Sequence, residues 1–251
     1  MNILVCVKRV PLTGGRIVLT DDERAIQTRH LGFTVSPHEE CGAEEAIRIV
    51  EAHGGSATVL TLGPPEAEEQ LRDLMAIGAD RGIHLVTDGS EWDPQATAAA
   101  IVAAVRSQAE PVDLILFGSE SADAGNYQVA VRVAEALGLP AVTGVKAISL
   151  DADRVRCEQE TSAGRDVYEV ALPAVVSVKE GINLPRYPSV PGRMKAKRKP
   201  VHAAEPTRTD ARLRMLRLAL PPESGRQAEV LGRGPEAAPA VVEMLRDIGV
   251  M

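Results

Sequence analysis

Aromatic residues are scarce in this sequence of 251 residues, which contains three Tyr, two Phe and one Trp. A core without them must be built from Val, Ile, Leu and Ala, which is typical of parallel sheets buried between helices. The same scarcity leaves few side chains against which a planar cofactor could stack. The composition therefore predicts an aliphatic α/β core.

Cysteine is also sparse, since Cys6, Cys41 and Cys157 are odd in number and widely spaced. They form no C-x-x-C pair, so neither a disulfide framework nor a zinc site is expected, and the cytoplasm is the compartment that such usage favours. The longest apolar runs are far shorter than the ~20 residues of a membrane span, so no membrane insertion is expected. The first residues, with charge after the apolar run, are unlike a secretory signal. A net charge of −7 argues against a nucleic-acid binder.

The common catalytic motifs are missing as well. No G-x-G-x-x-G follows the first apolar run, and the sequence contains no G-x-x-x-x-G-K-[ST], no G-x-S-x-G and no paired-histidine metal motif. The five histidines are scattered and are interpreted as surface or core residues: His30, His38, His53, His84 and His202. No catalytic residue and no metal site is therefore predicted.

Alternating strand and helix patterns fill the first half of the chain. Short apolar runs predict strands at residues 2–7, 57–62, 82–86 and 113–117. Helical patterns follow them at residues 37–53, 66–77, 94–107 and 128–137, with Pro37 near the first start and Asp93 as a plausible cap. This alternation predicts crossover connections and an open, mostly parallel sheet with helices on both faces.

The pattern changes after residue 140. Residues 143–150, 155–160, 166–172 and 174–179 are predicted strands joined by short turns, and they indicate an antiparallel extension at the edge of the sheet. No regular period follows until a final helix near residues 239–248. Because so long an irregular stretch is uncommon inside a domain, we expect an extended C-terminal arm that wraps around a partner.

A nucleotide site is plausible at the carboxyl ends of the strands, where open parallel sheets bind ligands. Residues 6–10, 61–64 and 118–129 are expected to meet there, and the last of these is a small-residue loop that leads into a helix. Exposed amides and the positive end of a helix favour a phosphate. Small loops before helices are common, so an ordinary strand–helix turn stays open as the alternative.

Several segments together resemble the β subunit of electron transfer flavoproteins. They are VKRV at residues 7–10, AEEA at 43–46, MAIGADRGIH at 75–84 and PRYPSVPGRMKAK at 185–197. Residues 155–160 and 172–177 are similar to a loose version of the family signature. The resemblance runs from about residue 2 to 200, and it implies a Rossmann-like sheet of the adenine nucleotide α-hydrolase type.

The resemblance also implies a heterodimer with an α subunit that mainly holds a redox-active FAD. The β subunit would bind AMP, or a second FAD in electron-bifurcating members. Electrons would arrive from acyl-CoA dehydrogenases or related flavin dehydrogenases and leave to a quinone oxidoreductase. The β subunit would therefore be an electron carrier without substrate turnover of its own.

Site residues carried over from the family fall into three groups. Next to the adenine end of the nucleotide we expect Cys6, Lys8 and Val10. The pocket would be lined by Ser36, Leu62 and Gly63. The phosphates would be surrounded by Ser121, Asp123, Asn126, Gln128 and Val129.

The phosphate loop departs from both types of the family. AMP-type members have roughly D-x-D-N-N-Q-T, whereas residues 123–129 of this chain are DAGNYQV. Val129 lacks the hydroxyl of the AMP type, which removes a hydrogen bond worth about 1–3 kcal/mol with a charged acceptor. Val129 resembles the bifurcating type and Asn126 resembles the AMP type, so the choice between AMP and a second FAD stays open.

Residues 183–192 resemble the loop that recognises the partner dehydrogenase. Val190 would be its apolar anchor, and Pro185 and Pro191 would lower the entropy lost on docking. The resemblance predicts a nucleotide-binding domain over residues 1–192 and a C-terminal arm and helix over 193–251 that pack on the α subunit. The alternative is a stand-alone adenine-nucleotide-binding α/β protein, either an ATP-dependent enzyme or a stress-type sensor, which would need neither the loop nor the arm.

Overall fold

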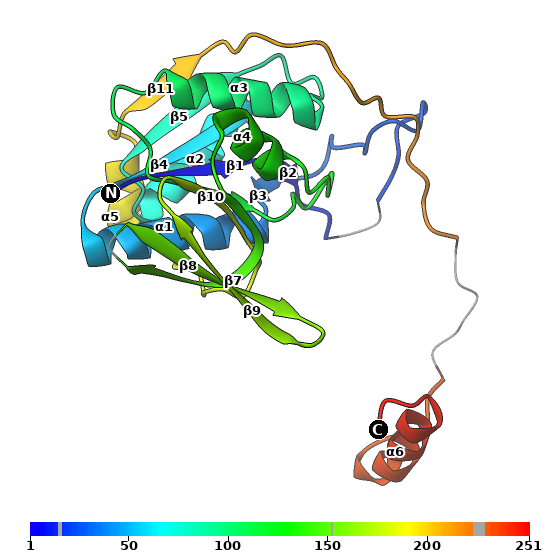
Figure 1. Cartoon of the computed structure of the whole chain (residues 1–251). Helices are drawn as coiled ribbons and strands as arrows, with labels where there is room; N and C mark the ends of the chain where they lie inside the picture. Colours follow the sequence, from blue (N-terminus) through cyan, green and yellow to red (C-terminus); the bar gives the residue numbers. More distant parts are fainter. Residues whose placement is uncertain (15–16, 152, 223–228) are drawn as a thin grey trace. The chain divides into compact units, whose positions relative to one another are not determined.

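The apolar runs of the chain form one sheet in the computed structural model, which describes residues 1–14, 17–151, 153–222 and 229–251. The sheet has nine strands in the order β11-β5-β4-β1-β6-β10-β7-β8-β9 (Figure 1). Their bounds are β1 (Asn2–Val7), β4 (Ser56–Gly63), β5 (Arg81–Val86), β6 (Leu114–Gly118), β7 (Ala141–Asp151), β8 (Arg154–Thr161), β9 (Gly164–Ala171), β10 (Ala174–Val178) and β11 (Val201–Ala204). A separate antiparallel pair, β2 (Arg9–Pro11) and β3 (Phe33–Val35), follows β1.

Neighbouring strands from β11 to β7 are parallel, whereas β8 and β9 continue the sheet as antiparallel strands. This confirms the predicted α/β fold with an open, mostly parallel sheet and an antiparallel extension. The helices are α1 (Pro37–His53), α2 (Glu68–Ile77), α3 (Pro94–Arg106), α4 (Val129–Leu137), α5 (Val190–Ala196) and α6 (Ala238–Asp247). Two 3₁₀ turns, η1 (Pro65–Ala67) and η2 (Pro235–Ala237), precede α2 and α6.

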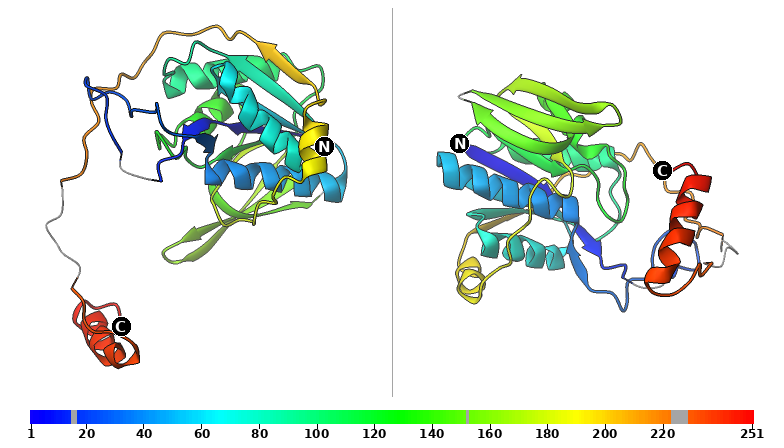
Figure 2. Two further views of the ribbon diagram at one scale, coloured as in Figure 1. Left: turned by 180° about the vertical axis from the view of Figure 1, so that it is seen from behind. Right: turned by 90° about the horizontal axis from the view of Figure 1, so that it is seen from below.

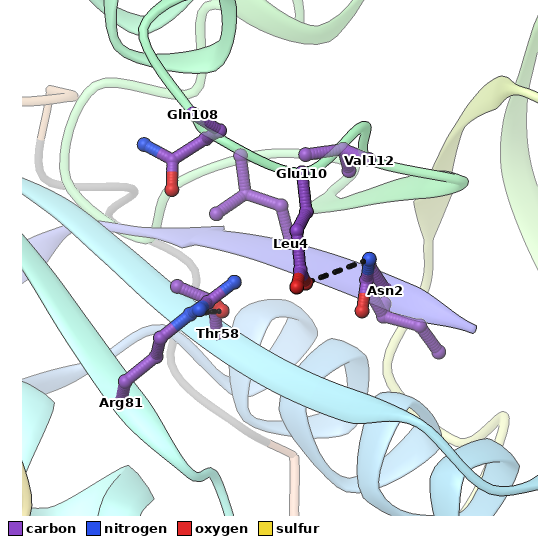
Figure 3. Close-up of a pocket in the computed structure, with 8 residues that line it drawn as sticks. Asn2, Leu4, Thr58, Arg81, Gln108, Glu110 and Val112 are labelled. Atoms are coloured by element: carbon purple, nitrogen blue, oxygen red, sulfur yellow. Dashed lines mark hydrogen bonds between the residues drawn. The ribbon is translucent and has the colours of Figure 1, made fainter.

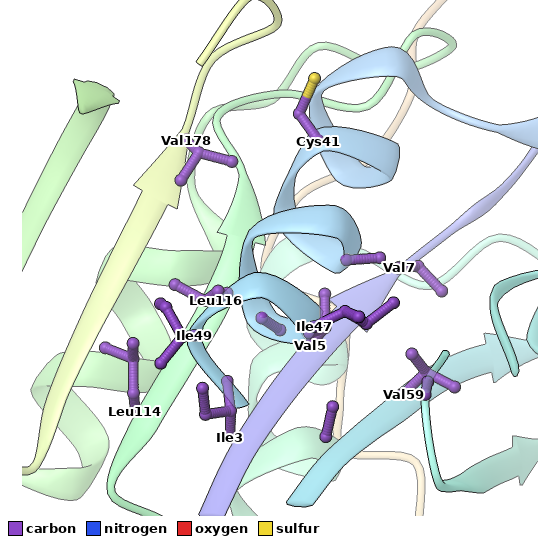
Figure 4. Close-up of a cluster of buried hydrophobic side chains, with 14 of the residues drawn as sticks. Ile3, Val5, Val7, Cys41, Ile47, Ile49, Val59, Leu114, Leu116 and Val178 are labelled. Atoms are coloured by element: carbon purple, nitrogen blue, oxygen red, sulfur yellow. The ribbon is translucent and has the colours of Figure 1, made fainter. Parts of the chain in front are cut away.

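Side-chain alternation along β1 divides the core into two layers. Ile3, Val5 and Val7 pack with α1 and α2, and Figure 4 shows Ile47 and Ile49 of α1 among them. Leu4 and Cys6 point to the other face, where they pack with α3 and α4. Because successive side chains of a strand point to opposite faces, an unbroken apolar run is needed to bury both. Figures 1 and 2 show these helices on the two sides of the sheet.

The position of β10 differs from the sequence interpretation, which grouped residues 174–179 with the antiparallel extension. β10 lies between β6 and β7 and is parallel to both. All five of its residues are buried. An unbroken buried run is typical of a central parallel strand, and the short connection from β9 hid this in the sequence.

The prediction that residues after Lys179 lack regular structure until the final helix is wrong for residues 190–204. α5 packs against α2, and β11 pairs in parallel with β5 at the edge of the sheet. Contacts among the described residues group the chain into two units, Met1–Leu216 and Arg217–Met251, and α5 and β11 belong to the first unit. A seven-residue helix and a four-residue strand are too short to give a period that sequence analysis can detect.

The second unit contains the final helix, α6, close to the predicted residues 239–248. None of its residues is buried among those that the structure describes. Packing of this unit on an α subunit stays a prediction.

Candidate functional site

The order of the strands creates a switch point beside β1. β1 pairs with β4 on one side and with β6 on the other, so Cys6 lies between Leu60 and Phe117. The chain first builds β4 and β5 outward from β1 and then crosses to β6. The connections leaving β1 and β6 therefore diverge at the carboxyl edge, which is where open α/β sheets bind ligands.

Lys8, the first residue after β1, pairs with the loop after β6. Its Nζ lies 2.7 Å from Oδ2 of Asp123 and 3.8 Å from Oε1 of Glu91. Burial by itself lowers the pKa of Lys8, but the carboxylates of Glu91 and Asp123 outweigh it and raise that pKa. The pKa of Asp123 is lowered because Lys8 outweighs the effect of burial on this carboxyl, whose side chain is 20% exposed. Both groups are therefore charged at neutral pH.

Glu39, in the first turn of α1, lies next to the Lys8–Asp123 pair. It is buried, and its Oε2 accepts a hydrogen bond of 2.8 Å from the backbone N–H of Lys8. Burial raises the pKa of Glu39 to about 8. A Cβ on Gly118, at the end of β6, would lie 2.7 Å from Cγ of Glu39, so this close packing requires glycine. The site thus contains a carboxyl group that can change its protonation near neutral pH.

Two helices begin at the switch point without a side-chain cap. Among the described residues, no side chain caps the first amides of α1 or α4. Ser36, at the cap position of α1, instead donates from Oγ to the carbonyl of Glu120 at 3.3 Å. By contrast, α3 is capped by Asp93, which accepts from the N–H of Ala96 at 2.8 Å. In α1, however, Pro37 has no N–H and the N–H of Glu39 donates to the carbonyl of Ser36 at 2.9 Å. The amides that favour an anion are therefore mainly those at the start of α4.

The loop between β6 and α4 has an unusual backbone. Gly125 and Tyr127 both have a positive φ, of 54° and 55°, and the N–H of Gly125 donates to the carbonyl of Ser121 at 3.0 Å. A positive φ is rare for a bulky residue such as Tyr127, and backbone strain of this kind is found at binding loops. Oε1 of Gln128 accepts hydrogen bonds from Arg132, so its side chain is fixed along α4.

The structure brings only part of the predicted nucleotide set together by direct contact. Lys8 and Asp123 form an ion pair, and Ser36 contacts the start of the same loop through Glu120. Leu62 and Gly63 end β4, and the carbonyl of Gly63 lies 3.2 Å from Nε2 of His84.

The remaining predicted residues are placed less directly. The Cys6 side chain belongs to the core layer of α3 and α4, and burial raises the pKa of its thiol. Val10 is buried in β2, while Asn126 is exposed and Val129 is the first residue of α4. The residues predicted to recognise a dehydrogenase, Pro185, Val190 and Pro191, belong to a different segment, at and before α5.

The opposite, amino edge of the sheet contains a small hollow (Figure 3). It is lined by residues that include Asn2, Leu4, Thr58 and Arg81. Nε of Arg81 donates to Oγ1 of Thr58 at 2.7 Å, so the polar groups there bond to each other. The hollow has room for little more than water and is not the candidate site.

No helix within the described ranges is long and apolar enough to cross a bilayer. The described part of the chain also contains no group of His, Cys, Asp and Glu side chains that could hold a metal ion.

Comparison with known proteins shows to which family the chain is similar. The profile of the electron transfer flavoprotein domain matches residues 25–209. The electron transfer flavoprotein subunit beta of Syntrophomonas wolfei is 37% identical over 88% of this chain and 86% of its own length. That of Bacillus subtilis is 32% identical over 98% of both chains, and the mitochondrial one of Arabidopsis thaliana is 35% identical over 80% of both. The chain belongs to the family of electron transfer flavoprotein β subunits.

Membership of the electron transfer flavoprotein family extends to the second unit, because the alignment with the Bacillus subtilis relative covers nearly the whole chain. The resemblance found in the sequence is thereby confirmed. Sequence reasoning nevertheless missed Glu39, Glu91 and Glu120, which surround Lys8 and Ser36. For Glu39 a signal was present, since it precedes Ala43 and Ala46 on the buried face of α1, where an acidic residue is out of place.

Proposed function

We propose that this chain is the β subunit of a heterodimeric electron transfer flavoprotein that binds an adenine nucleotide at the switch point. The observation that carries the proposal is the uncapped start of α4, because the loop that precedes this helix pairs with Lys8 through Asp123. Such a cluster of amides with one cation suits a phosphate. Two further buried polar atoms, Nδ1 of His38 and Nε of Arg9, have no hydrogen-bond partner among the described residues and could serve a ligand.

The residues present fit an adenylate. Lys8 and the amides at residues 126–129 would hold the phosphate end, Ser36 would line the pocket, and the nucleotide would stabilise the diverging loops. When bound to the complex, FAD would supply the acceptance and release of electrons. This chain would contribute orientation and electrostatics to a flavin held mainly by the α subunit.

Release of nucleotides tests this part of the proposal. The chain would be co-expressed with its α subunit, and FAD and AMP would be quantified after denaturation. One FAD and one AMP per heterodimer would indicate the conventional type, and two FAD would indicate the bifurcating type. A complex without any adenine nucleotide beyond the FAD of the α subunit would refute a nucleotide site in this chain.

Electrons would come from flavin dehydrogenases of the acyl-CoA dehydrogenase type and pass to a quinone oxidoreductase. Support comes from Leu184, Tyr187, Val190 and Met194, which are large apolar side chains exposed in one segment. Such a patch favours a chain with a protein partner over the stand-alone alternative.

Val190→Ala tests the dehydrogenase contact. Removing an apolar anchor that is 75% exposed in the free chain should raise the KM for the heterodimer about tenfold. The readout is reduction of the heterodimer by an acyl-CoA dehydrogenase and its acyl-CoA substrate, followed with a dye as final acceptor. The FAD content should not change; an unaltered KM would argue against Val190 as the anchor.

A further inference from the structure

Residues 183–194, here called the docking segment, expose four large apolar side chains. Tyr187 is 96% exposed, Leu184 83%, Val190 75% and Met194 64%. A segment that exposes so much apolar surface would be expected to collapse onto the domain unless its backbone is held. The residues that hold the docking segment have no role in the nucleotide binding or electron transfer proposed above.

One buried carboxylate, Glu44 in α1, accounts for the main contact. Arg186 of the docking segment donates to Oε2 of Glu44 from its backbone N–H at 3.1 Å and from Nε at 3.0 Å. Nη2 of the same guanidinium donates to Oε1 of Glu44 at 3.0 Å. Arg48 donates to that oxygen at 2.8 Å, and the Glu44 side chain is only 2% exposed. Glu44 therefore binds both the backbone and the side chain of Arg186.

Two flanking contacts orient the docking segment further. Nη1 of Arg186 donates to Oε1 of Glu51 at 2.6 Å, one helical turn beyond Arg48. Nδ2 of Asn183 donates to the carbonyl of Cys41 at 2.9 Å and to Oε2 of Glu45 at 2.8 Å. All of these acceptors belong to α1, so one helix face holds the start of the segment.

The far end of the docking segment is held by α2. Nη1 of Arg193 lies 2.7 Å from Oδ1 of Asp73, and a Cβ on Gly192 would lie 2.4 Å from the carbonyl oxygen of Ala76. α5 therefore approaches α2 as closely as glycine allows. Between these two attachments, Tyr187 and Val190 extend from a backbone that is fixed at both ends.

A simple surface ion pair would not explain this arrangement. Exposed Arg–Glu pairs contribute little to stability, whereas removing one partner of a buried pair leaves an uncompensated charge. Glu44 is buried, and the segment that it holds exposes its large apolar side chains to solvent and adds none of them to the core. Holding the backbone before a partner arrives lowers the entropy lost on binding.

We propose that Glu44 is a positioning residue that holds the docking segment, through Arg186, in the conformation that a flavin dehydrogenase binds. The inference rests on the proposed electron-carrier function and assigns a role in it to α1. Glu44 itself would contact neither the dehydrogenase nor the flavin.

Limited proteolysis tests the conformational part without any electron transfer. Trypsin must take the Arg186 side chain into its own pocket to cleave the bond before Tyr187, and Glu44 and Glu51 compete for that side chain. In the intact heterodimer, Glu44→Gln should speed this cleavage about tenfold, as expected for the loss of a charged hydrogen-bond acceptor. Cleavage is followed by mass spectrometry. An unchanged rate would overturn the proposal.

Steady-state kinetics test the docking part. With an acyl-CoA dehydrogenase as donor, Glu44→Gln should raise the KM for the heterodimer about tenfold while kcat changes less than about twofold. Glu44→Asp, which keeps the charge, should recover part of the affinity. Glu158→Gln is the matched control, because Glu158 also binds two arginines, Arg156 and Arg165, but lies in β8 away from the docking segment. It should leave KM and cleavage unchanged.

Arg186→Gln keeps the proposal testable if Glu44→Gln fails to fold. It removes the same contact from the exposed side and leaves Glu44 paired with Arg48. It should raise KM as much as Glu44→Gln, and an unchanged KM would overturn the positioning role.

The two possible failures are distinguishable. If the unaltered heterodimer is not reduced by the dehydrogenase, the electron-carrier function fails and the docking role fails with it. If the unaltered heterodimer is reduced with a saturable KM that Glu44→Gln does not change, only the positioning role is overturned.

Discussion

At the amino edge of the sheet, carboxylates accept hydrogen bonds from amides near the start of neighbouring strands, whereas at the carboxyl edge carboxylates also surround the ammonium group of Lys8. Oδ2 of Asp113 accepts from the N–H of Asn2 at 2.7 Å, and Oδ2 of Asp80 accepts from that of Ala57 at 2.9 Å. At the other edge, Glu39 is buried beside the Lys8–Asp123 pair. Acidic residues at the amino edge thus satisfy strand amides, whereas those at the carboxyl edge lie in the candidate site.

The largest expected effect is a pH dependence of the free energy of unfolding that comes from Glu39 at the carboxyl edge. The pKa of Glu39 is raised to about 8 in the folded chain, so the folded state binds this proton more tightly than the unfolded state. The free energy of unfolding should therefore fall as pH rises from the ordinary glutamate pKa of about 4.3 to about 8. Lys8 and Asp123, which face the carboxyl group, are charged throughout this range.

Glu39→Gln should remove that pH dependence, because glutamine is neutral at every pH. In the nucleotide-free chain, the free energy of unfolding of the variant should match that of the unaltered protein near pH 4 and exceed it by about 5 kcal/mol near pH 9. Urea unfolding at several pH values measures this. Parallel stability profiles for the two proteins would contradict a raised pKa.

Lys8→Met should have a smaller effect and lower the free energy of unfolding by about 2 kcal/mol. This substitution removes the ion-pair partner of the Asp123 carboxylate, and the Asp123 side chain is only 20% exposed. The affinity of the heterodimer for AMP, measured by calorimetry, should fall at least about tenfold through the lost charge-assisted contact. Lys146→Met is the control, since Lys146 is also half-buried but lies in β7. Equal AMP affinity in the two variants would remove Lys8 from the site.

The smallest effect belongs to the amino edge. Asp113→Ala removes the acceptor of the Asn2 amide and should lower the free energy of unfolding by about 1 kcal/mol. AMP affinity should not change, because Asp113 lies at the other end of the strands. A loss of AMP binding as large as that of Lys8→Met would erase the distinction between the two edges.

Sequence patterns predicted most of the sheet and its helices. β1 and α1 have the predicted bounds, and β4, β5 and β6 begin or end within one residue of them. Long runs of one period are informative because burial selects apolar residues at every turn or on both faces. The short α5 and β11 were missed, and β10 was assigned to the wrong part of the sheet. Their positions depend on which strands and helices they contact and not on local pattern.

For the candidate site, sequence alone identified the segments, the family and most of the polar residues near the switch point. The strand order decided that residue 8 would pair with residue 123, and that Glu39 would lie below them. It also brought Arg186 onto Glu44, 142 residues earlier in the chain. Local propensity and motif spacing are properties of the chain, whereas ion pairing and burial depend on which distant segments the packed sheet places side by side.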